Sequence, residues 1–511
     1  MHGPFDETHI NAGCEENGQL KRSMIKNAAA NLSRGGAAAV VALLLPPILV
    51  RHMAPSSYAV WVLALQAAAY LGYLDFGLQT AVGRYIAFAN EKKDTNLRDA
   101  TFSTAVAGLS IAAVLGLFVV AAIAVAAHQI FPAIPPDLLV PLRVTMLIVG
   151  ISVSLGLPAS AWNGIFVGMQ RYEIPAFTVG TGKLLSAAGL IYAALTGKSL
   201  VLMAIIAGAA NLYTYALQFV IQRRVFPEIH FRMGLIKGPI IREVFGYCFS
   251  LTIWSFSMLL VNGFDLLLVG RFQFGAVTPY AVSATLITFL AGVQIAVFGV
   301  IMPRAAELHA QENSEALGRL LIKTTKLGVY LLLLTGLPLI VFAAPIIKVW
   351  IGSQFAQVGG PILLILAIAN MVRLTGTPYA SILVGTGQQR LIIVGPLMEG
   401  FSNLVASVLL GWKYGAIGVA WGTLVGAVIG MLANTLYNIP KTRNYICVSK
   451  RAYVRGGILL PAICGVPVFL AAIYFEVTGA ATISLWIVSL FCAICASLFG
   501  AFQSIRQGRS V

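Results

Sequence analysis

The stretch TFSTAVAGLSIAAVLGLFVVAAIAVAA, residues 101–127, decides the fold class of this chain, because it contains no charged residue. An uninterrupted apolar run of 18 residues or more is long enough to cross a hydrocarbon core about 30 Å thick as a helix. About fourteen such segments follow one another between Asn31 and Phe502. We expect spans near 31–50, 57–82, 101–127, 140–168, 172–195, 199–221, 244–270, 278–302, 325–347, 359–385, 390–411, 415–438, 455–475 and 480–502. The sequence therefore predicts an all-α integral membrane protein.

The positive charges indicate which ends of the spans share a compartment. Numbered along the chain, the odd gaps between spans hold six of the 34 Lys and Arg residues, and three more lie within spans. The remaining 25 lie in the even gaps and the two tails. The six are Arg51, Arg143, Lys198, Arg271, Lys348 and Lys413. Since cytoplasmic loops carry the excess of Lys and Arg, we expect the even gaps and both termini in the cytoplasm.

Composition supports a membrane protein and excludes several other classes. Hydrophobic residues make up 59% of the chain and charged residues 10%, against about 25% charged in soluble domains. The net charge of +16 is explained by cations that flank spans beside an anionic leaflet, so we expect no nucleic-acid partner. No gap exceeds about 25 residues, too short for a soluble catalytic domain.

The chain contains an internal duplication. LLLPPILVRHMAPSSYAV (Leu43–Val60) and LLLVGRFQFGAVTPYAV (Leu266–Val282) each give an apolar run, an Arg and Tyr-Ala-Val. IFVGMQR (Ile165–Arg171) and ILVGTGQQR (Ile382–Arg390) form a second pair in the same order. Both pairs are about six spans apart. An even offset preserves orientation, which predicts two six-helix lobes in parallel repeat, followed by two further helices.

This pattern predicts five parts of the chain. They are a cytoplasmic tail without fixed structure at 1–24, a first lobe at 25–226, a basic cytoplasmic linker at 227–243, a second lobe at 244–440, and a basic loop with two more spans and a short tail at 441–511.

Six charged residues within lipid depth are the candidate site residues, because an ionisable group near the bilayer centre needs a functional or structural reason. Lys183, Arg373 and Glu399 fall near the midplane, Arg34 and Asp75 in the cytoplasmic third, and Asp265 near the outer surface. Arg34 and Asp265 have the alternative of extending to the nearest headgroups. Arg373 and Glu399 have the alternative of a structural ion pair, whereas Lys183 is the strongest candidate for a cation that faces a cavity.

Cations in a watered cavity suit a phosphate group. Carboxylates there could neutralise those cations or carry a coupling proton or sodium ion, and the sequence leaves both roles open. The scattered His residues have no metal-ligand spacing. Gly197-Lys198-Ser199 lacks the preceding Gly of a phosphate-binding loop, since Tyr192 stands there. We therefore expect no enzyme activity, no cofactor and no metal site.

The stretch from Asn27 to Phe88 resembles the opening of the bacterial polysaccharide repeat-unit flippases, a family of the multidrug/oligosaccharidyl-lipid/polysaccharide exporter superfamily. The resemblance is carried by Asn31, LLLPPILV, Tyr58, Trp61 and LDFGLQTAVGRYIA (Leu74–Ala87), and by the two junctions IFVGMQR and ILVGTGQQR. It covers about residues 25–440. Its most specific piece is FG-x6-R at Phe76, Gly77 and Arg84.

The resemblance implies two lobes around a central cleft that opens alternately to either side of the bacterial inner membrane. The cargo would be a polyprenyl-diphosphate-linked oligosaccharide for cell-surface polysaccharide or lipopolysaccharide. Arg34, Lys183 and Arg373 would engage its diphosphate and sugars, and a polysaccharide polymerase would be a possible partner. The two extra spans leave room for the lipid II flippase branch. The alternatives are an ion-coupled drug or small-solute exporter of the same superfamily, and a membrane-embedded glycosyl- or acyltransferase.

Overall fold

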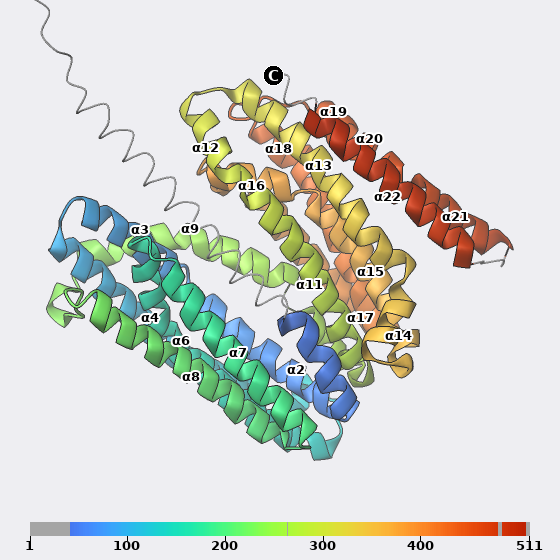
Figure 1. Cartoon of the computed structure of the whole chain (residues 1–511). Helices are drawn as coiled ribbons and strands as arrows, with labels where there is room; N and C mark the ends of the chain where they lie inside the picture. The colour runs from blue at the N-terminus through green and yellow to red at the C-terminus, as the bar shows by residue number, and fades with distance from the viewer. Residues whose placement is uncertain (1–40, 263, 479–482, 507–511) are drawn as a thin grey trace, which may run out of the picture. The chain divides into compact units, whose positions relative to one another are not determined.

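The fold is entirely helical over the described residues 41–262, 264–478 and 483–506 of this computed structural model (Figure 1). Arg34, the 1–24 tail and the start of the first predicted span lie outside these residues. The helices are Val41–His52; α2, Pro55–Ala69; α3, Leu78–Glu91; α4, Thr95–Val125; α5, Ala127–Ile130; α6, Pro136–Gly168; α7, Glu173–Leu195; α8, Leu200–Val225; α9, Gly238–Asn262; α10, Asp265–Phe272; α11, Val277–Gly299; α12, Ile301–Ala310; α13, Ser314–Val341; α14, Ala343–Ile351; α15, Ala356–Leu374; α16, Thr377–Gly385; α17, Val394–Ala433; α18, Ile439–Lys441; α19, Lys450–Ala452; α20, Leu460–Ala462; α21, Val466–Thr478; and α22, Ile483–Arg506.

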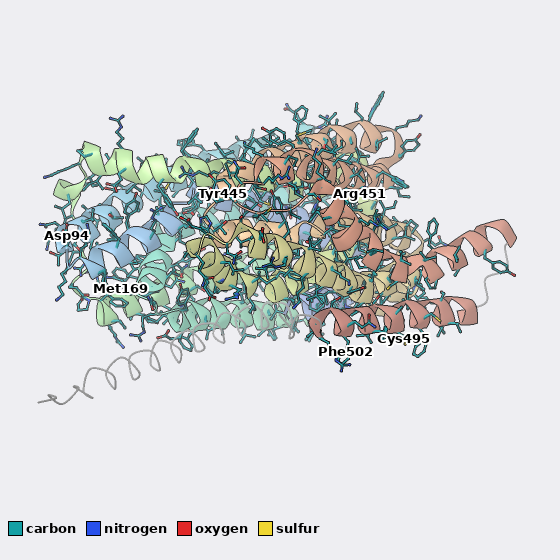
Figure 2. All side chains as sticks on the ribbon, turned by 90° about the horizontal axis from the view of Figure 1, so that it is seen from above. Asp94, Met169, Tyr445, Arg451, Cys495 and Phe502 are labelled. Atoms are coloured by element: carbon teal, nitrogen blue, oxygen red, sulfur yellow. The ribbon has the colours of Figure 1, made fainter. Side chains whose placement is uncertain are left out.

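Twelve helices in the described part of the chain are long and apolar enough to cross a membrane. Val41–His52 is a shorter apolar helix, and its predicted span begins at residue 31, outside the described residues. One of the twelve, Val394–Lys441, contains the two predicted spans 390–411 and 415–438. Each of the fourteen predicted segments therefore has a helical counterpart. Figure 2 shows that side chains such as Phe502 stand exposed on α22, as expected of surfaces that face lipid.

The chain divides into two compact units. The first holds residues 74–119 and 148–249 with the start of the described chain, and the second holds 45–73, 120–147 and 250–511. The core of the first unit joins α3, α4, α6 and α9 through buried residues such as Ile86, Phe102, Phe166 and Val244. In the second unit, α15 packs against α17 and α11, and α13 packs against α22.

The second span is broken at the Phe76-Gly77 pair of the FG-x6-R motif. A short 3-10 segment, Tyr70–Asp75, precedes the break, and α3 follows it. Phe76 (φ 49°) and Gly77 (φ 78°) both adopt left-handed backbone conformations, which Gly tolerates and Phe adopts at a cost. Asp75 accepts a hydrogen bond from the backbone N of Gln79 at 3.2 Å. The carboxylate thus satisfies one of the free donors at the start of α3.

Phe298 and Gly299 stand 222 residues after Phe76 and Gly77, the same offset that relates Tyr58 to Tyr280. They end α11, directly before α12. A break therefore recurs at the equivalent place in the eighth span. This third mark of the duplication lies between two features that the sequence comparison used, and it was missed because a two-residue match is short.

α17 is a tight helical hairpin rather than one straight helix. Gly415 has φ 63° and ψ −141°, so the chain reverses there. Gly422 faces Ser407, Gly426 faces Asn403 and Gly430 faces Glu399 across the two segments. A Cβ on Gly422 would lie 2.5 Å from the Cα of Ser407. The glycines spaced four apart thus allow the segments to approach at backbone distance, as their spacing predicts.

We expect Gly422→Ala to lower the unfolding temperature of the purified protein markedly. The added methyl group meets backbone rather than a movable side chain, so the hairpin must open, at a cost of about 1–3 kcal/mol or more. Gly292→Ala in α11 is the matched control, since a Cβ there meets nothing within 4 Å and alanine favours helix. Equal unfolding temperatures for the two variants in a thermal melt would show that this close approach does not matter.

The ninth span begins earlier than predicted. α13 starts at Ser314, whereas the hydropathy pattern predicted a start near 325. The Asn313 side chain accepts a hydrogen bond from the backbone N of Ala316 at 2.9 Å and so caps the helix. Arg319 and Lys323, which fall between the predicted spans 278–302 and 325–347, therefore lie on a helix. Likewise, α9 begins at Gly238, inside the predicted linker 227–243.

Candidate functional site

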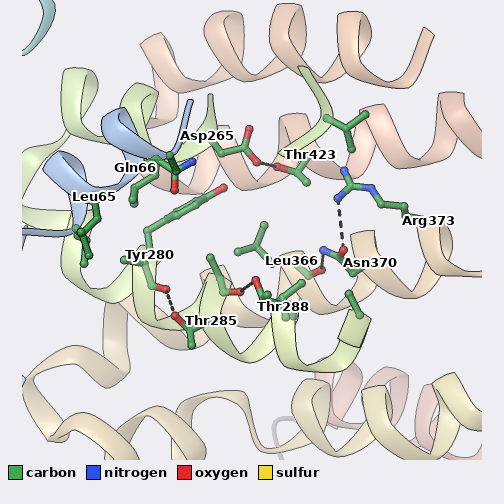
Figure 3. A pocket seen from close by; sticks show the side chains of 18 residues that line it. Leu65, Gln66, Asp265, Tyr280, Thr285, Thr288, Leu366, Asn370, Arg373 and Thr423 are labelled. Atoms are coloured by element: carbon green, nitrogen blue, oxygen red, sulfur yellow. Dashed lines mark hydrogen bonds between the residues drawn. The ribbon is translucent and has the colours of Figure 1, made fainter. Parts of the chain in front are cut away.

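A cavity of about 660 Å³ lies within the second unit. Its walls come from α2, α10, α11, α15 and α17 (Figure 3), and its volume is typical of small-molecule sites. Apolar side chains make up much of the wall, with polar groups from each of these helices among them. The polar lining residues are Gln66, Asp265, Tyr280, Thr285, Thr288, Asn370, Arg373 and Thr423.

Asp265 is the carboxylate of this cavity. It is the first residue of α10, where the positive end of the helix dipole favours a negative charge. The Thr423 hydroxyl donates to its Oδ2 at 2.8 Å, and the Asn403 amide donates to its Oδ1 at 3.4 Å. Because Asn403 and Thr423 come from opposite segments of the α17 hairpin, the hairpin positions both donors.

The Asp265 side chain does not take the alternative of extending to the nearest headgroups. Its carboxylate points into the cavity and hydrogen-bonds with Thr423 (Figure 3). The residue lies toward one end of its span, as the sequence predicted, but its side chain turns inward. A half-buried carboxylate within a membrane helix is costly unless it has a functional or structural role, and the two donors stabilise its charge.

Arg373 and Glu399 form an ion pair between α15 and α17. Arg373 Nε donates to Glu399 Oε1, and only 15% and 11% of the two side chains are exposed. Arg373 Nη1 also reaches Asn370 Oδ1 at 3.4 Å. Gly430 makes room for the acid, since a Cβ there would lie 2.5 Å from Glu399 Oε2. The structural ion pair that the sequence left open is therefore present.

The pair changes what Arg373 can do in the cavity. Arg373 lines the cavity with Asp265, and Glu399 opposes its charge from behind. One guanidinium group is thus balanced by two carboxylates. A cavity with more carboxylate than guanidinium charge around it suits hydroxyl groups and cations better than a dianion, because a diphosphate would meet net negative charge.

The other two predicted site residues that the structure describes belong to the first unit. Lys183 is exposed on α7, in the first unit. Asp75 is also in the first unit, where the Ser160 hydroxyl lies 3.3 Å from its Oδ1 and the residue caps α3. Arg34 falls outside the described residues. The structure therefore brings together Asp265, Arg373 and Glu399 of the six.

Sequence reasoning missed the uncharged polar residues of the site. Gln66, Asn370 and Thr423 line the cavity, and Asn403 holds both Asp265 and the backbone O of Val261, the latter at 3.0 Å. The available signal was amide side chains within predicted spans, which are used for hydrogen bonds between membrane helices.

Solved structures of transporters share this fold. An inward closed conformation of the lipid II flippase MurJ aligns with a TM-score of 0.68 and 13% identity, over 94% of this chain and 99% of that one. An inward-facing multidrug resistance MATE family transporter of the MOP superfamily aligns at 0.64 and 14% identity, over 82% and 98%. The Vibrio cholerae MATE transporter VcmN in the bent form aligns at 0.57 and 15% identity, over 85% and 99%.

No family model matches the sequence, and no curated protein does. At identities of this size the likeness shows the fold alone, which this chain shares with these transporters.

Proposed function

We propose that this protein is a flippase that moves polyprenyl-diphosphate-linked oligosaccharide repeat units across the bacterial cytoplasmic membrane, for cell-surface polysaccharide or lipopolysaccharide synthesis. The observation that carries the proposal is the polar cavity inside a helical membrane unit. Its amide and hydroxyl groups, Gln66, Asn370, Tyr280 and Thr288 among them, suit the hydroxyl groups of a sugar. A cavity of about 660 Å³ holds part of an oligosaccharide, and the prenyl chain would remain in lipid.

In this proposal, cations outside this cavity bind the diphosphate of the cargo. Arg373 is balanced by Glu399, so we assign it to positioning and to hydrogen bonds with sugar oxygens. Lys183 and Arg34 then remain as the diphosphate-binding residues. Translocation would follow by alternating access, in which opposite ends of the cavity open in turn.

Asp265 is the candidate for ion coupling. Its carboxylate, with the hydroxyl oxygen of Thr423 nearby, offers hard oxygen groups that a sodium ion prefers, and it could equally carry a proton. Asp75 and Glu399 have local structural partners, which favours a charge-balancing or capping role for them.

A second candidate function is the ion-coupled export of drugs or small solutes. The specific observation in its favour is the excess of carboxylate over cation around the cavity, since acidic sites attract cationic drugs. Transport of lipid II is a third possibility. The lipid II flippase structure aligns over a larger share of this chain than the MATE structures do.

Cells that lack the protein would discriminate among these functions. We expect lipid-linked repeat units to accumulate on the cytoplasmic face and surface polymer to disappear. Unchanged polymer with altered drug tolerance would support the exporter instead. Accumulation of lipid II with normal repeat units would support the third possibility.

Lys183→Ala is expected to lower repeat-unit translocation about tenfold or more while the protein still inserts and accumulates, because a charge-assisted contact to the diphosphate is lost. Lys198→Ala is the matched control, since Lys198 is exposed just after α7. Surface polymer per molecule of transporter measures the effect. Normal polymer output from the Lys183 variant would remove this residue from the site.

A further inference from the structure

Two arginines at equivalent positions of the internal repeat make the same kind of bond. Arg51 lies at the end of helix Val41–His52, and Arg271 lies in the last turn of α10. Each follows the apolar run of a repeated junction. Both belong to the six cations found on the weakly basic side of the predicted topology, where the positive-inside bias gives no reason for them.

Each arginine binds the last turn of a short helix. Arg51 Nη2 donates to the backbone O of Val349 at 2.9 Å and of Trp350 at 3.3 Å, at the end of α14. Arg271 Nη1 donates to the backbone O of Gln129 at 3.0 Å and of Ile130 at 3.1 Å, at the end of α5. Carbonyl groups at a helix C-terminus lack intrahelical donors and carry the negative end of the dipole, so a guanidinium group stabilises them.

The two sets of bonds are related by one offset. Arg271 stands 220 residues after Arg51, Val349 stands 220 after Gln129, and Trp350 stands 220 after Ile130. Arg51 belongs to the first lobe and binds the second, whereas Arg271 belongs to the second lobe and binds the first. All these residues lie in the second unit. The bonds are therefore reciprocal ties between the halves of the repeat.

We propose that Arg51 and Arg271 form a reciprocal clasp that holds the two lobes together at the end of the spans opposite the basic loops, and that both ties must break for the cavity to open there. The proposal rests on the alternating access proposed above. A third bond supports it, because the Thr278 hydroxyl of the second lobe donates to the backbone O of Pro55 in the first at 2.8 Å.

The exposure of the arginines fits a clasp that opens and closes. Both side chains are exposed, so water can replace the carbonyl groups when the bonds break. Hydrogen bonds of this kind add a modest net stability. A buried guanidinium group would lose its partners at far greater cost and would fix the lobes in one state.

Pulsed electron spin resonance on the full chain in liposomes, without cargo, tests the clasp. The six native cysteines are first replaced by alanine. Spin labels at Ala54→Cys and Gln354→Cys, both exposed positions on either side of the Arg51 tie, then report the distance across this tie. We expect Arg51→Ala/Arg271→Ala to raise the ratio of long to short label distances roughly tenfold. Each single alanine variant should shift this ratio less than the double variant does. The two single shifts should be similar to each other, because the two ties are equivalent.

Arg143→Ala is the matched control. Arg143 Nη2 also donates to a helix carbonyl, the backbone O of Val125 at 3.2 Å, but within the same lobe. Its loss should leave the label distances unchanged. In Arg51→Lys/Arg271→Lys, the ratio of long to short label distances should fall between those of the parent and the double alanine variant. An ammonium group can still reach a carbonyl but lacks the planar fork of donors.

Unchanged label distances in the double alanine variant, or an equal change in the Arg143 variant, would overturn the clasp. If the double variant or the cysteine-free background fails to fold, the clasp is tested instead by hydrogen exchange. The single arginine variants are then compared with the parent in protein that keeps its native cysteines. Faster exchange in both α5 and α14 supports the clasp, and exchange as in the parent overturns it. These measurements use no cargo, so a normal repeat-unit pool in cells lacking the protein would defeat the proposed function and leave the clasp standing.

Discussion

Removal of Glu399 alone is expected to destabilise the protein more than removal of both Glu399 and Arg373. In Glu399→Leu, the Arg373 guanidinium group stays in a site where only 15% of its side chain is exposed, without the carboxylate that Nε binds. Breaking a buried ion pair from one side costs about 3–5 kcal/mol, whereas replacing both partners by apolar residues of similar size is often nearly neutral. We therefore expect Arg373→Met/Glu399→Leu to recover most of the loss in unfolding temperature.

Arg304 and Glu307 provide the control pair. Their contact is short, at 2.7 Å, but 57% and 53% of the side chains are exposed. An exposed pair contributes about 0–1 kcal/mol to stability, so Glu307→Leu should scarcely change the unfolding temperature. If the double change at 373 and 399 costs as much as the sum of the single changes, the two residues act independently. Exchanging the two charges, Arg373→Glu/Glu399→Arg, should recover only part of the loss, because Gly430 leaves little room beside position 399.

Asp265→Asn is expected to abolish the response of translocation to an ion gradient. Asparagine keeps the size of the side chain but removes the charge that would hold a sodium ion or proton beside Thr423 and Asn403. A gradient can drive transport only through a group whose ion occupancy differs between conformations. Proteoliposomes carrying a lipid-linked oligosaccharide, with an imposed sodium or pH gradient, measure the effect.

In the parent protein we expect one of the two gradients to raise the translocation rate about tenfold or more. Asp137→Asn is the control, because Asp137 is exposed at the start of α6. A gradient response in Asp265→Asn equal to that of the control would assign coupling to another group. A response lost in both variants would point to damage that is not specific to the cavity.

The spans and their repetition were predictable because they depend on local composition. Apolar runs such as 101–127 can only be satisfied as helices in lipid, and α4 (Thr95–Val125) is the result. The helix ends were less predictable. α13 continues through Glu315 and Arg319, because a helix ends where its capping residues and packing end rather than where lipid does.

The site was predictable only in part. Asp265, Arg373 and Glu399 stood out because charge in an apolar run is rare. Their grouping depends on the reversal at Gly415 and the close approach at Gly426 and Gly430, which bring residues far apart in sequence next to one another. The sequence shows the glycines but not which partner each one faces.

The reciprocal arginine bonds also constrain the order of biosynthesis. The acceptors of Arg51 lie 298 and 299 residues further along the chain, so they do not exist while the first lobe leaves the ribosome. Arg271, in contrast, finds its acceptors 142 and 141 residues behind it, already synthesised. The second-made arginine, Arg271, can thus bond first. Helix Val41–His52, with the guanidinium group of Arg51 hydrated, must wait in the bilayer until the residues up to Trp350 have been made.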